Sequence, residues 1–205
     1  MTTILPSWPY RIDLHVHTRR YSPCAEAIDP ENLPRIMADT GLSGLVLTEH
    51  DTIWPMHDVK VLNRRLPHGR IYTGVEVSTR NGHFIVIGIT SLHGITPGMT
   101  VHALVALAQA REAAVIWAHP HFNYENTMEP LPLDRMAAGI HAVEVAGISA
   151  DTHIHGMAHR MGWTVVAGSD AHCPSCIGRF VTHFSQMPEN EKALAAAIRQ
   201  GRCAT

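Results

Sequence analysis

The chain has 205 residues, of which 45% are hydrophobic and 17% are charged, and its formal net charge is −2. This length can bury a hydrophobic core without disulfides, and the composition excludes a disordered tail, a fibrous repeat and a strongly basic protein that coats nucleic acid. No apolar run approaches the roughly 18–20 residues that cross a bilayer, and no secretory signal is visible at the N-terminus.

Strand-like and helix-like patterns alternate along the chain. Period-2 runs rich in β-branched residues predict strands, and 3.6-residue periodicity predicts the helices between them. The expected strands are Tyr10–Thr18, Gly44–Glu49, Ile71–Ser78, His83–Ile89, Ala114–Ala118, Ala142–Ala146 and Thr164–Ala167, with a short eighth stretch at Arg179–Phe184. The expected helices are Pro30–Thr40, Pro55–Leu66, Val101–Ala113, Leu133–Ala138, Ala150–Met161 and Glu189–Gln200.

This alternation predicts an α/β fold with a largely parallel sheet, in one domain that covers residues 1–205. A doubly wound sheet usually carries a glycine-rich phosphate loop after its first strand. Here the first strand ends in His-Val-His-Thr instead. A closed or nearly closed barrel fits better, because barrel sites lie at the carboxyl ends of the strands.

Histidine is the unusual residue in the composition. There are 16 histidines, scattered from His15 to His183, against only two lysines, Lys60 and Lys192. Histidine is the commonest metal ligand and the usual acid or base near neutral pH. The composition therefore favours metal or acid–base chemistry.

The four cysteines predict a reduced, cytoplasmic chain, because a core of this size needs no disulfides and no export signal is present. Cys173 and Cys176 form a Cys-Pro-Ser-Cys pair. A structural zinc site usually needs a second such pair, which this sequence lacks. We interpret the two residues as loop thiols, with a metal or redox role as the alternative.

Potential metal ligands follow one strand after another. Alternation places Asp13, His15 and His17 on one face of the first strand. Neutral imidazoles and carboxylates suit zinc, manganese or iron(II), and clustered carboxylates repel one another unless a cation neutralises them. The later strands contribute Glu49, His50 and Asp51, then Glu76, His83, His119 and His121, Glu144, and finally Asp170 and His172.

The motifs resemble those of the PHP (polymerase and histidinol phosphatase) superfamily over residues 10 to about 180. They are Asp-Leu-His-Val-His-Thr at 13–18, Thr-Glu-His-Asp at 48–51, Gly-Val-Glu-Val-Ser at 74–78, Gly-His-Phe at 82–84, Ala-His-Pro at 118–120 and Gly-Ser-Asp-Ala-His at 168–172. The resemblance implies a distorted seven-stranded (β/α)7 TIM-like barrel and a trinuclear metal centre that hydrolyses phosphoesters. It implies a first metal held by His15, His17, Glu76 and Asp170, a second held by Glu76, His83 and His119, and a third held by His50 and His172.

The loop after the first motif departs from the family pattern. Many members have an Asp or His there as a further ligand of the third metal, and Pro23 occupies the aligned position. Cys24 or Glu26 could substitute from the same loop, or the third site could be weak or empty. A carboxylate there would favour a hard cation, whereas a thiolate would favour a soft one.

Other polar residues near the motifs receive provisional roles. We expect Asp13 to orient a ligand imidazole, and Glu144 to face the rim, where it could contact substrate or transfer protons. His172 or His121 could protonate the leaving group. Arginines can hold phosphate oxygens through two hydrogen bonds, and the candidates are Arg19, Arg20 and Arg179.

The resulting hypothesis is a phosphoric ester hydrolase in which two or three Zn, Mn or Fe ions activate water, with Glu76, Asp170 and the rim histidines in the catalytic machinery. The expected partner is a small phosphorylated substrate or nucleotide, without a membrane or an extended nucleic-acid groove. One alternative is a metal-dependent amidohydrolase, but neither lysine lies in a predicted strand that could supply a carbamylated bridge. The other is a non-catalytic metal-binding or regulatory module with a degraded third site. The physiological substrate and the oligomeric state remain open at this stage.

Overall fold

The computed structural model describes residues 8–120, 139–145 and 152–205. The predicted helix Leu133–Ala138 and the candidate acid His121 lie outside the described residues. Among those residues, no helix combines the length and the apolar character required to cross a membrane.

The strands within the described part of the chain form one eight-stranded sheet in the order β7-β6-β5-β4-β3-β2-β1-β8. Every predicted strand is present within a few residues of its expected ends, including the short eighth one. The strands are β1 (Tyr10–Val16), β2 (Gly44–Leu47), β3 (Arg70–Thr79), β4 (Gly82–Ile87), β5 (Ala114–Trp117), β6 (Ala142–Glu144), β7 (Thr164–Val166) and β8 (Thr182–Phe184).

The sheet is mixed, which differs in part from the largely parallel sheet that the sequence predicts. Four neighbouring pairs are parallel, namely β1–β2, β2–β3, β5–β6 and β6–β7. In contrast, β4 runs antiparallel to both β3 and β5, and β8 runs antiparallel to β1. Only residues 80 and 81 separate β3 from β4, and so short a connection permits only an antiparallel pair.

The two edges of the sheet approach each other and nearly close a barrel. Beyond β7, Ala171 pairs in parallel with Val16 of β1. The hydroxyl of Thr182 in β8 accepts a hydrogen bond from the Ala167 amide and donates one to the Ala167 carbonyl, both at 2.8 Å. The predicted PHP-type distorted barrel is confirmed by this nearly closed sheet.

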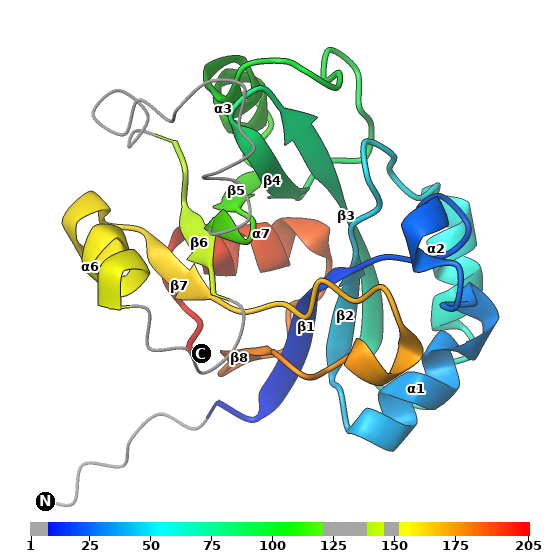
Figure 1. The fold of residues 1–205 in the computed structure, drawn as a ribbon. Helices are drawn as coiled ribbons and strands as arrows, with labels where there is room; N and C mark the ends of the chain where they lie inside the picture. The colour runs from blue at the N-terminus through cyan, green and yellow to red at the C-terminus, as the bar shows by residue number, and fades with distance from the viewer. Residues whose placement is uncertain (1–7, 121–138, 146–151) are drawn as a thin grey trace, which may run out of the picture.

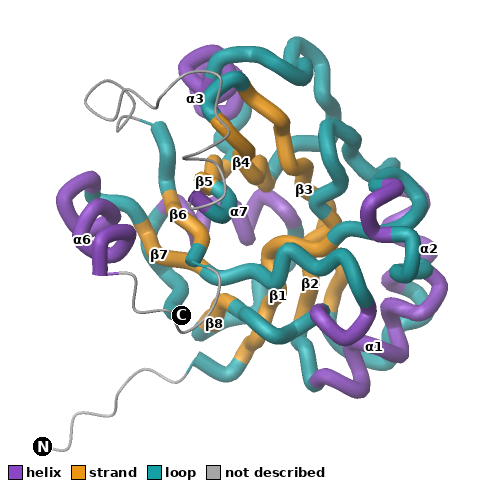
Figure 2. The backbone as a smooth tube through the Cα atoms, in the orientation of Figure 1, coloured by secondary structure: helices purple, strands orange, loops and turns teal. Residues whose placement is uncertain are grey.

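The helices lie outside the strands, as Figures 1 and 2 show. Three buried apolar clusters join them to the sheet, with α1 and α2 on one side, α3 and α6 on another and α7 on a third. In α7, Leu194, Ala195 and Ile198 share one face and are fully buried. The helices are α1 (Leu33–Thr40), α2 (Met56–Asn63), α3 (Val101–Gln109), α6 (Thr152–Met161) and α7 (Glu191–Arg199).

The helix-end signals in the sequence also have their expected geometry. Asp29 accepts a hydrogen bond from the Glu31 amide and caps the short 3-10 turn that leads into α1. Gly41 and Gly162 follow α1 and α6 with φ angles of 65° and 69°, a left-handed conformation that glycine adopts at little cost.

Gly168, which follows β7, permits the closest approach of backbone to the polar interior. A methyl group there would lie 2.5 Å from Glu144 Oε1 and 2.7 Å from His15 Cβ. We expect Gly168→Ala to reduce the free energy of unfolding by about 1–3 kcal/mol, because the well-packed neighbours must move. Urea unfolding followed by circular dichroism measures this change.

Gly156→Ala is the matched control, because a Cβ atom at this position in α6 would meet only Arg160 Nη1, at 3.5 Å. Replacing a glycine inside a helix by alanine should stabilise the fold by about 0.5–1 kcal/mol. Equal effects of the two substitutions would contradict the close approach at Gly168.

Candidate metal centre

The barrel brings all eight sequence-predicted ligands to one place. His15, Glu76 and His83 lie within β1, β3 and β4, and the other five follow the ends of β1, β2, β5 and β7 by one to six residues. One ligand atom from each residue falls within 4.8 Å of the others in four overlapping groups. These groups are His15, His17 and Asp170; His15, Glu76 and His119; His50, Glu76 and His83; and His17, His50 and His172.

Glu76 lies at the centre of these groups and is fully buried in β3. Its Oε1 is 2.9 Å from both His83 Nδ1 and His119 Nε2, and its Oε2 is 2.9 Å from His50 Nδ1. Burial alone would raise the pKa of Glu76, but the charge of His15 and the hydrogen bond from His119 outweigh it and hold the pKa well below its ordinary value. The carboxylate is therefore ionised and faces imidazoles on both oxygens.

Asp170 closes the group on the side of β1. Its Oδ1 is 3.2 Å from His17 Nε2 and 3.4 Å from His15 Nε2. Burial opposes ionisation of Asp170, but the adjacent His17 imidazole and the charge of His15 lower its pKa below the ordinary value. Like Glu76, this carboxylate is ionised while its Oδ1 is buried.

Two of the ligands adopt strained backbone conformations. The φ angles of His119 and Asp170 are 27° and 47°. Residues other than glycine rarely adopt positive φ, at a cost of about 1–3 kcal/mol each, and such residues concentrate at functional sites. The backbone thus turns both side chains toward Glu76 in conformations that local sequence preference disfavours.

The residues fit divalent metal ions, and this fit is supported by two buried carboxylate oxygens that lack hydrogen bonds in the described part of the chain. Within the described structure, Glu76 Oε2 and Asp170 Oδ1 are buried without a hydrogen bond of acceptable geometry, although imidazole nitrogens lie nearby. The His15 Nε2 and His17 Nε2 atoms face each other at 3.0 Å. Ligand atoms around one first-row ion, each about 2.1 Å from it, lie roughly 3.0–3.4 Å apart, which is the spacing found between these atoms.

The buried imidazoles of His15 and His17 are electrostatically coupled to this acidic surrounding. Burial lowers the pKa of His15, but the carboxylates of Glu144 and Glu76 raise it well above its ordinary value. For His17, burial is likewise outweighed by the adjacent carboxylates of Asp170 and Glu76, so its pKa is raised. Without a metal the centre retains protons, which bound cations would displace.

The group of His17, His50 and His172 corresponds to the third metal. His172 donates from Nδ1 to the carbonyl oxygen of Asp170 at 2.9 Å, which leaves Nε2 as its ligand atom. Among the described residues, the ligand groups include neither Cys24 nor Glu26, and both side chains are exposed. Partial burial raises the pKa of Cys24, which keeps the thiol protonated. The structure therefore does not bring the two substitute ligands to this group.

Glu144 does not face the rim, contrary to expectation. This β6 residue is 1% exposed and lies beneath the ligands. Its carboxylate oxygens are 3.1 and 3.2 Å from His15 Nδ1, and Oε2 accepts a hydrogen bond from the His119 amide. A Nδ1–H group that donates to Glu144 directs the Nε2 lone pair of His15 at the metal centre. Glu144 is thus a positioning residue rather than a group that touches substrate.

Asp13 also differs from its expected role. It contacts no ligand imidazole among the described interactions. Its Oδ1 instead accepts hydrogen bonds from the amides of His15 and Ser169, and its Oδ2 accepts one from the Gly178 amide. Burial raises the pKa of Asp13 to about 6 despite these bonds. The residue therefore joins β1 to the segment that follows β7.

Sequence reasoning missed Ser22, which lies beside Pro23 in the loop after β1. Its Oγ is 3.3 Å from His17 Nδ1 and also accepts a hydrogen bond from the His50 amide at 3.3 Å. A lone serine in a loop carries no metal signal, and its role becomes visible only when the loop is folded over β2.

The three candidate phosphate-binding arginines are exposed, and each contacts a different partner. Arg19 pairs with Asp29 at 2.5 Å, and Arg20 pairs with Asp58 at 2.7 Å and stacks on Trp54. The Arg179 guanidinium carbon lies 5.9 Å from the centroid of the Phe180 ring. Their role toward substrate stays a prediction.

A family model described as PHP-associated matches residues 155–203, a segment that contains Asp170 and His172. No curated protein sequence matches significantly. The matched segment runs from within α6 to the C-terminal residues and covers less than half of the chain.

Solved structures share the fold at low sequence identity. A two-domain protein of Bacteroides vulgatus, described as containing a predicted PHP-like metal-dependent phosphoesterase, has a TM-score of 0.70 and 18% identity over 95% of this chain and 64% of its own. The lesion-specific endonuclease PfuEndoQ of Pyrococcus furiosus has a TM-score of 0.65 and 17% identity over 93% of this chain and 56% of its own. An amidohydrolase of Chromobacterium violaceum has a TM-score of 0.57 and 21% identity over 82% of this chain and 90% of its own.

The class that fold and site define is a PHP-type barrel with a candidate metal centre. The resemblance to the PHP superfamily is confirmed by the family model at the C-terminal side and by the shared fold. The chain spans less than two thirds of the Bacteroides and Pyrococcus proteins.

The contacts of Glu144 yield a test of metal positioning. We expect Glu144→Gln to weaken metal affinity by about 10–100-fold, because the amide cannot accept from His15 and the His119 backbone as the carboxylate does. Calorimetric titration of the metal-depleted protein with Mn²⁺ measures this loss.

Glu26→Gln is the control for that variant, because Glu26 is exposed and belongs to none of the ligand groups. Its Mn²⁺ affinity should equal that of the unmodified protein. A Glu144→Gln variant with unchanged affinity, or an equal loss in both variants, would contradict the positioning role.

Proposed function

We propose that the protein is a metal-dependent phosphoesterase that hydrolyses a phosphomonoester or a nucleotide-type phosphoester at a centre of two or three divalent transition-metal ions. One observation carries the proposal. The buried Glu76 carboxylate faces imidazoles of β4 and β5 through Oε1 and the His50 imidazole through Oε2. A carboxylate that faces ligands on both oxygens suits two adjacent cations, which is the arrangement used to clamp phosphoryl oxygens.

The ligand assignment follows from the groups. His15, His17, Glu76 and Asp170 would hold one ion, Glu76, His83 and His119 a second, and His50 with His172 and the neighbouring His17 a third. Bound Zn, Mn or Fe ions would supply Lewis acidity, which activates water and neutralises charge on a phosphoryl group. Glu144 and Asp13 hold the His15 ring and backbone, and Ser22 contacts the His17 ring.

The open side of the centre favours a small phosphoester, or a phosphate at the end of a longer molecule, as the substrate. The side chains of His50, His83 and His172 are 32–36% exposed, whereas those of His15, His17 and Glu76 are fully buried. A substrate phosphate would therefore approach from the exposed imidazoles. Among the described residues His172 is the candidate for proton donation, a role open to its Nε2 only when that atom holds no metal ion, because its Nδ1–H is hydrogen-bonded to the Asp170 carbonyl. The net charge of −2 does not favour an extended nucleic-acid groove.

Two features support phosphoester over amide hydrolysis. The bridging position is occupied by a carboxylate, and both lysines, Lys60 in α2 and Lys192 in α7, lie on helices rather than in the centre. The Chromobacterium protein, which shares the fold, is described as an amidohydrolase, so the fold is compatible with both reactions and the bridging carboxylate is the feature that favours phosphoesters. A non-catalytic metal-binding module is disfavoured because all eight expected ligands converge.

Metal depletion tests the reaction class. Protein treated with a chelator should lose hydrolysis of p-nitrophenyl phosphate and of a panel of nucleotide esters, and addition of Mn²⁺ or Zn²⁺ should restore it. Absorbance and released phosphate measure turnover. The same protein is also assayed on a panel of amide substrates. Hydrolysis of amides but not of phosphoesters would support the amidohydrolase instead, and metal binding without turnover of phosphoesters or amides would support the regulatory module instead.

Removal of the shared carboxylate tests the centre itself. Glu76→Ala should abolish both metal loading, measured by elemental analysis, and phosphoester turnover, because the imidazoles then have no common anionic partner. Glu26→Ala is the matched control and should keep both. Circular dichroism establishes that the variants are folded, and full activity of folded Glu76→Ala protein would overturn the assignment.

A further inference from the structure

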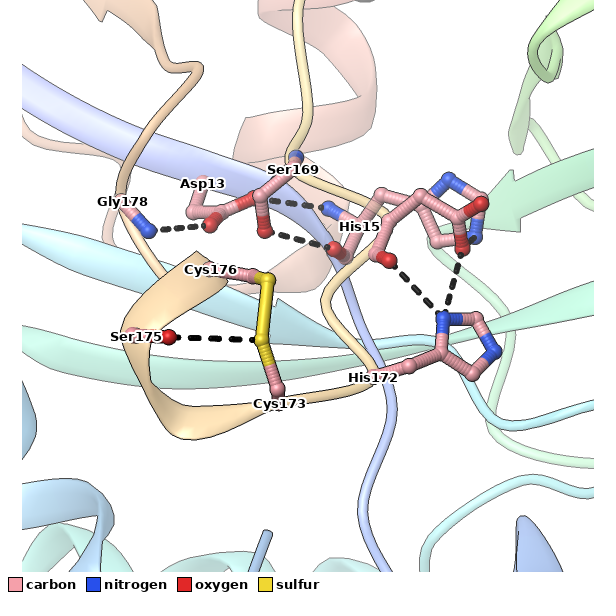
Figure 3. The surroundings of a disulfide bond; sticks show 9 residues. Asp13, His15, Ser169, His172, Cys173, Ser175, Cys176 and Gly178 are labelled. Carbon is pink, nitrogen blue, oxygen red and sulfur yellow. Dashed lines mark hydrogen bonds and ion pairs between the residues drawn. A yellow bond between two sulfur atoms is a disulfide. The ribbon is translucent and has the colours of Figure 1, made fainter. Parts of the chain in front are cut away.

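A disulfide joins Cys173 and Cys176 immediately after the ligand His172 (Figure 3). The sequence favoured loop thiols at these positions, and the structure instead brings the two sulfurs into a bond across a 3-10 turn at Pro174–Cys176. Both cysteine side chains are partly exposed. The pair is therefore within reach of a soluble thiol and within one residue of the metal centre.

The N-terminal side of this turn belongs to the third ligand group. The His172 ring lies 4.6 Å from the His17 ring and 6.1 Å from the His50 ring, measured between centroids. Apart from these rings, His172 contacts Asp170, two residues earlier in the same segment. The position of the His172 side chain thus depends on the backbone that runs into Cys173.

Asp13 fixes the two ends of the segment to β1. The Ser169 amide donates to its Oδ1 at 2.9 Å, and the Gly178 amide donates to its Oδ2 at 2.8 Å (Figure 3). Between these anchors Ala171 pairs with β1, because its amide donates to the His15 carbonyl and its carbonyl accepts from the His17 amide, both at 3.2 Å. The turn that follows has backbone hydrogen bonds from the Cys176 amide to the Cys173 carbonyl, at 3.0 Å, and from the Ile177 amide to the Pro174 carbonyl, at 3.4 Å, together with the disulfide. The disulfide is the covalent cross-link within this segment, and its cleavage would free the residues that follow His172 without releasing Ala171 or the two ends.

The third group is the part of the centre that such a change would affect. His15, Glu76 and His83 lie within strands, whereas His172 immediately precedes the turn that the disulfide closes. The third group also gains no ligand from Cys24 or Glu26. Its affinity therefore depends on three imidazoles, of which one adjoins this turn.

We propose that Cys173 and Cys176 form a redox-reversible pair whose disulfide positions His172 and increases the metal affinity of the His17–His50–His172 group. This inference rests on the proposed metal centre. A soluble dithiol attacks one sulfur as its thiolate, forms a mixed disulfide and releases the other cysteine as a thiol. The second thiol of the reductant then displaces the remaining cysteine, so that the protein gains two thiols and the dithiol becomes a cyclic disulfide.

The experiment compares oxidised and reduced protein after the reagents have been removed under nitrogen. Alkylation of denatured protein followed by mass spectrometry should count two free thiols in the oxidised protein, Cys24 and the buried Cys203, and four in the reduced protein. Titration with Mn²⁺ should then show the weakest site about tenfold weaker after reduction, at the lower end of the loss expected when the support of a metal ligand is removed. The tighter sites should keep their affinities.

Three variants locate the effect. The double variant Cys173→Ser/Cys176→Ser should bind as the reduced protein does under both conditions, and Cys24→Ser should retain the full response. His172→Ala should lose the weak site and, with it, the redox response. Equal affinities of oxidised and reduced protein, or tighter binding after reduction through thiolate ligands, would overturn the inference.

Phosphoester hydrolysis, measured in the same samples, separates this inference from the proposed function. Turnover in both redox states with an unchanged Mn²⁺ titration would overturn the switch and leave the phosphoesterase standing. A redox-dependent titration without turnover in either state would support the switch and count against the phosphoesterase.

Discussion

The burial of ionised carboxylates among imidazoles is the constraint on which the centre depends. Glu76 is fully buried, and Asp170 and Glu144 lie around the same imidazole, that of His15. Carboxylates this close repel one another in a medium of low dielectric constant, and unpaired buried charge is costly. Protonated imidazoles offset part of this cost in the metal-free chain, and divalent cations would offset it more completely because they also displace the protons.

The strands of the barrel explain how a cluster of carboxylates and imidazoles can be buried inside an otherwise apolar fold. Side chains alternate along β1, so that Ile12 and Leu14 join the apolar cluster shared with α7 while Asp13 and His15 lie on the other face. Likewise, Val75 and Val77 belong to the apolar cluster beneath α3, and Glu76 between them points away from it. The polar interior is therefore a consequence of period-2 alternation in strands whose two faces are both covered.

Much of this organisation could be predicted from the sequence because it depends on local patterns. Every strand was found near its predicted ends, and the eight ligands were found because each lies within a strand or in the segment that follows one. Long-range partners could not be found in the same way. Glu144 was placed on the rim because its position in β6 gave no information on which neighbour it would meet, and Asp13 was assigned to an imidazole although it binds backbone amides from residues 169 and 178. The positive φ angles of His119 and Asp170 have no sequence signature, because neither residue is a glycine.

The three predicted metal positions differ in how firmly the fold supports them. Glu76 and His83 form part of a regular antiparallel pair, and the His15 ring is held by Glu144 from the neighbouring side of the barrel. By contrast, His50 and His172 follow their strands, and their side chains are about one third exposed. Ligands on rigid strands lose less freedom on binding than ligands on loops, so the same imidazole contributes more affinity from a strand. The rigidity of the ligands therefore decreases across the centre. The ligands around Glu76 are firmly held, whereas His50 and His172 are adjustable and lie on the open side, where solvent reaches the protein and substrate would approach.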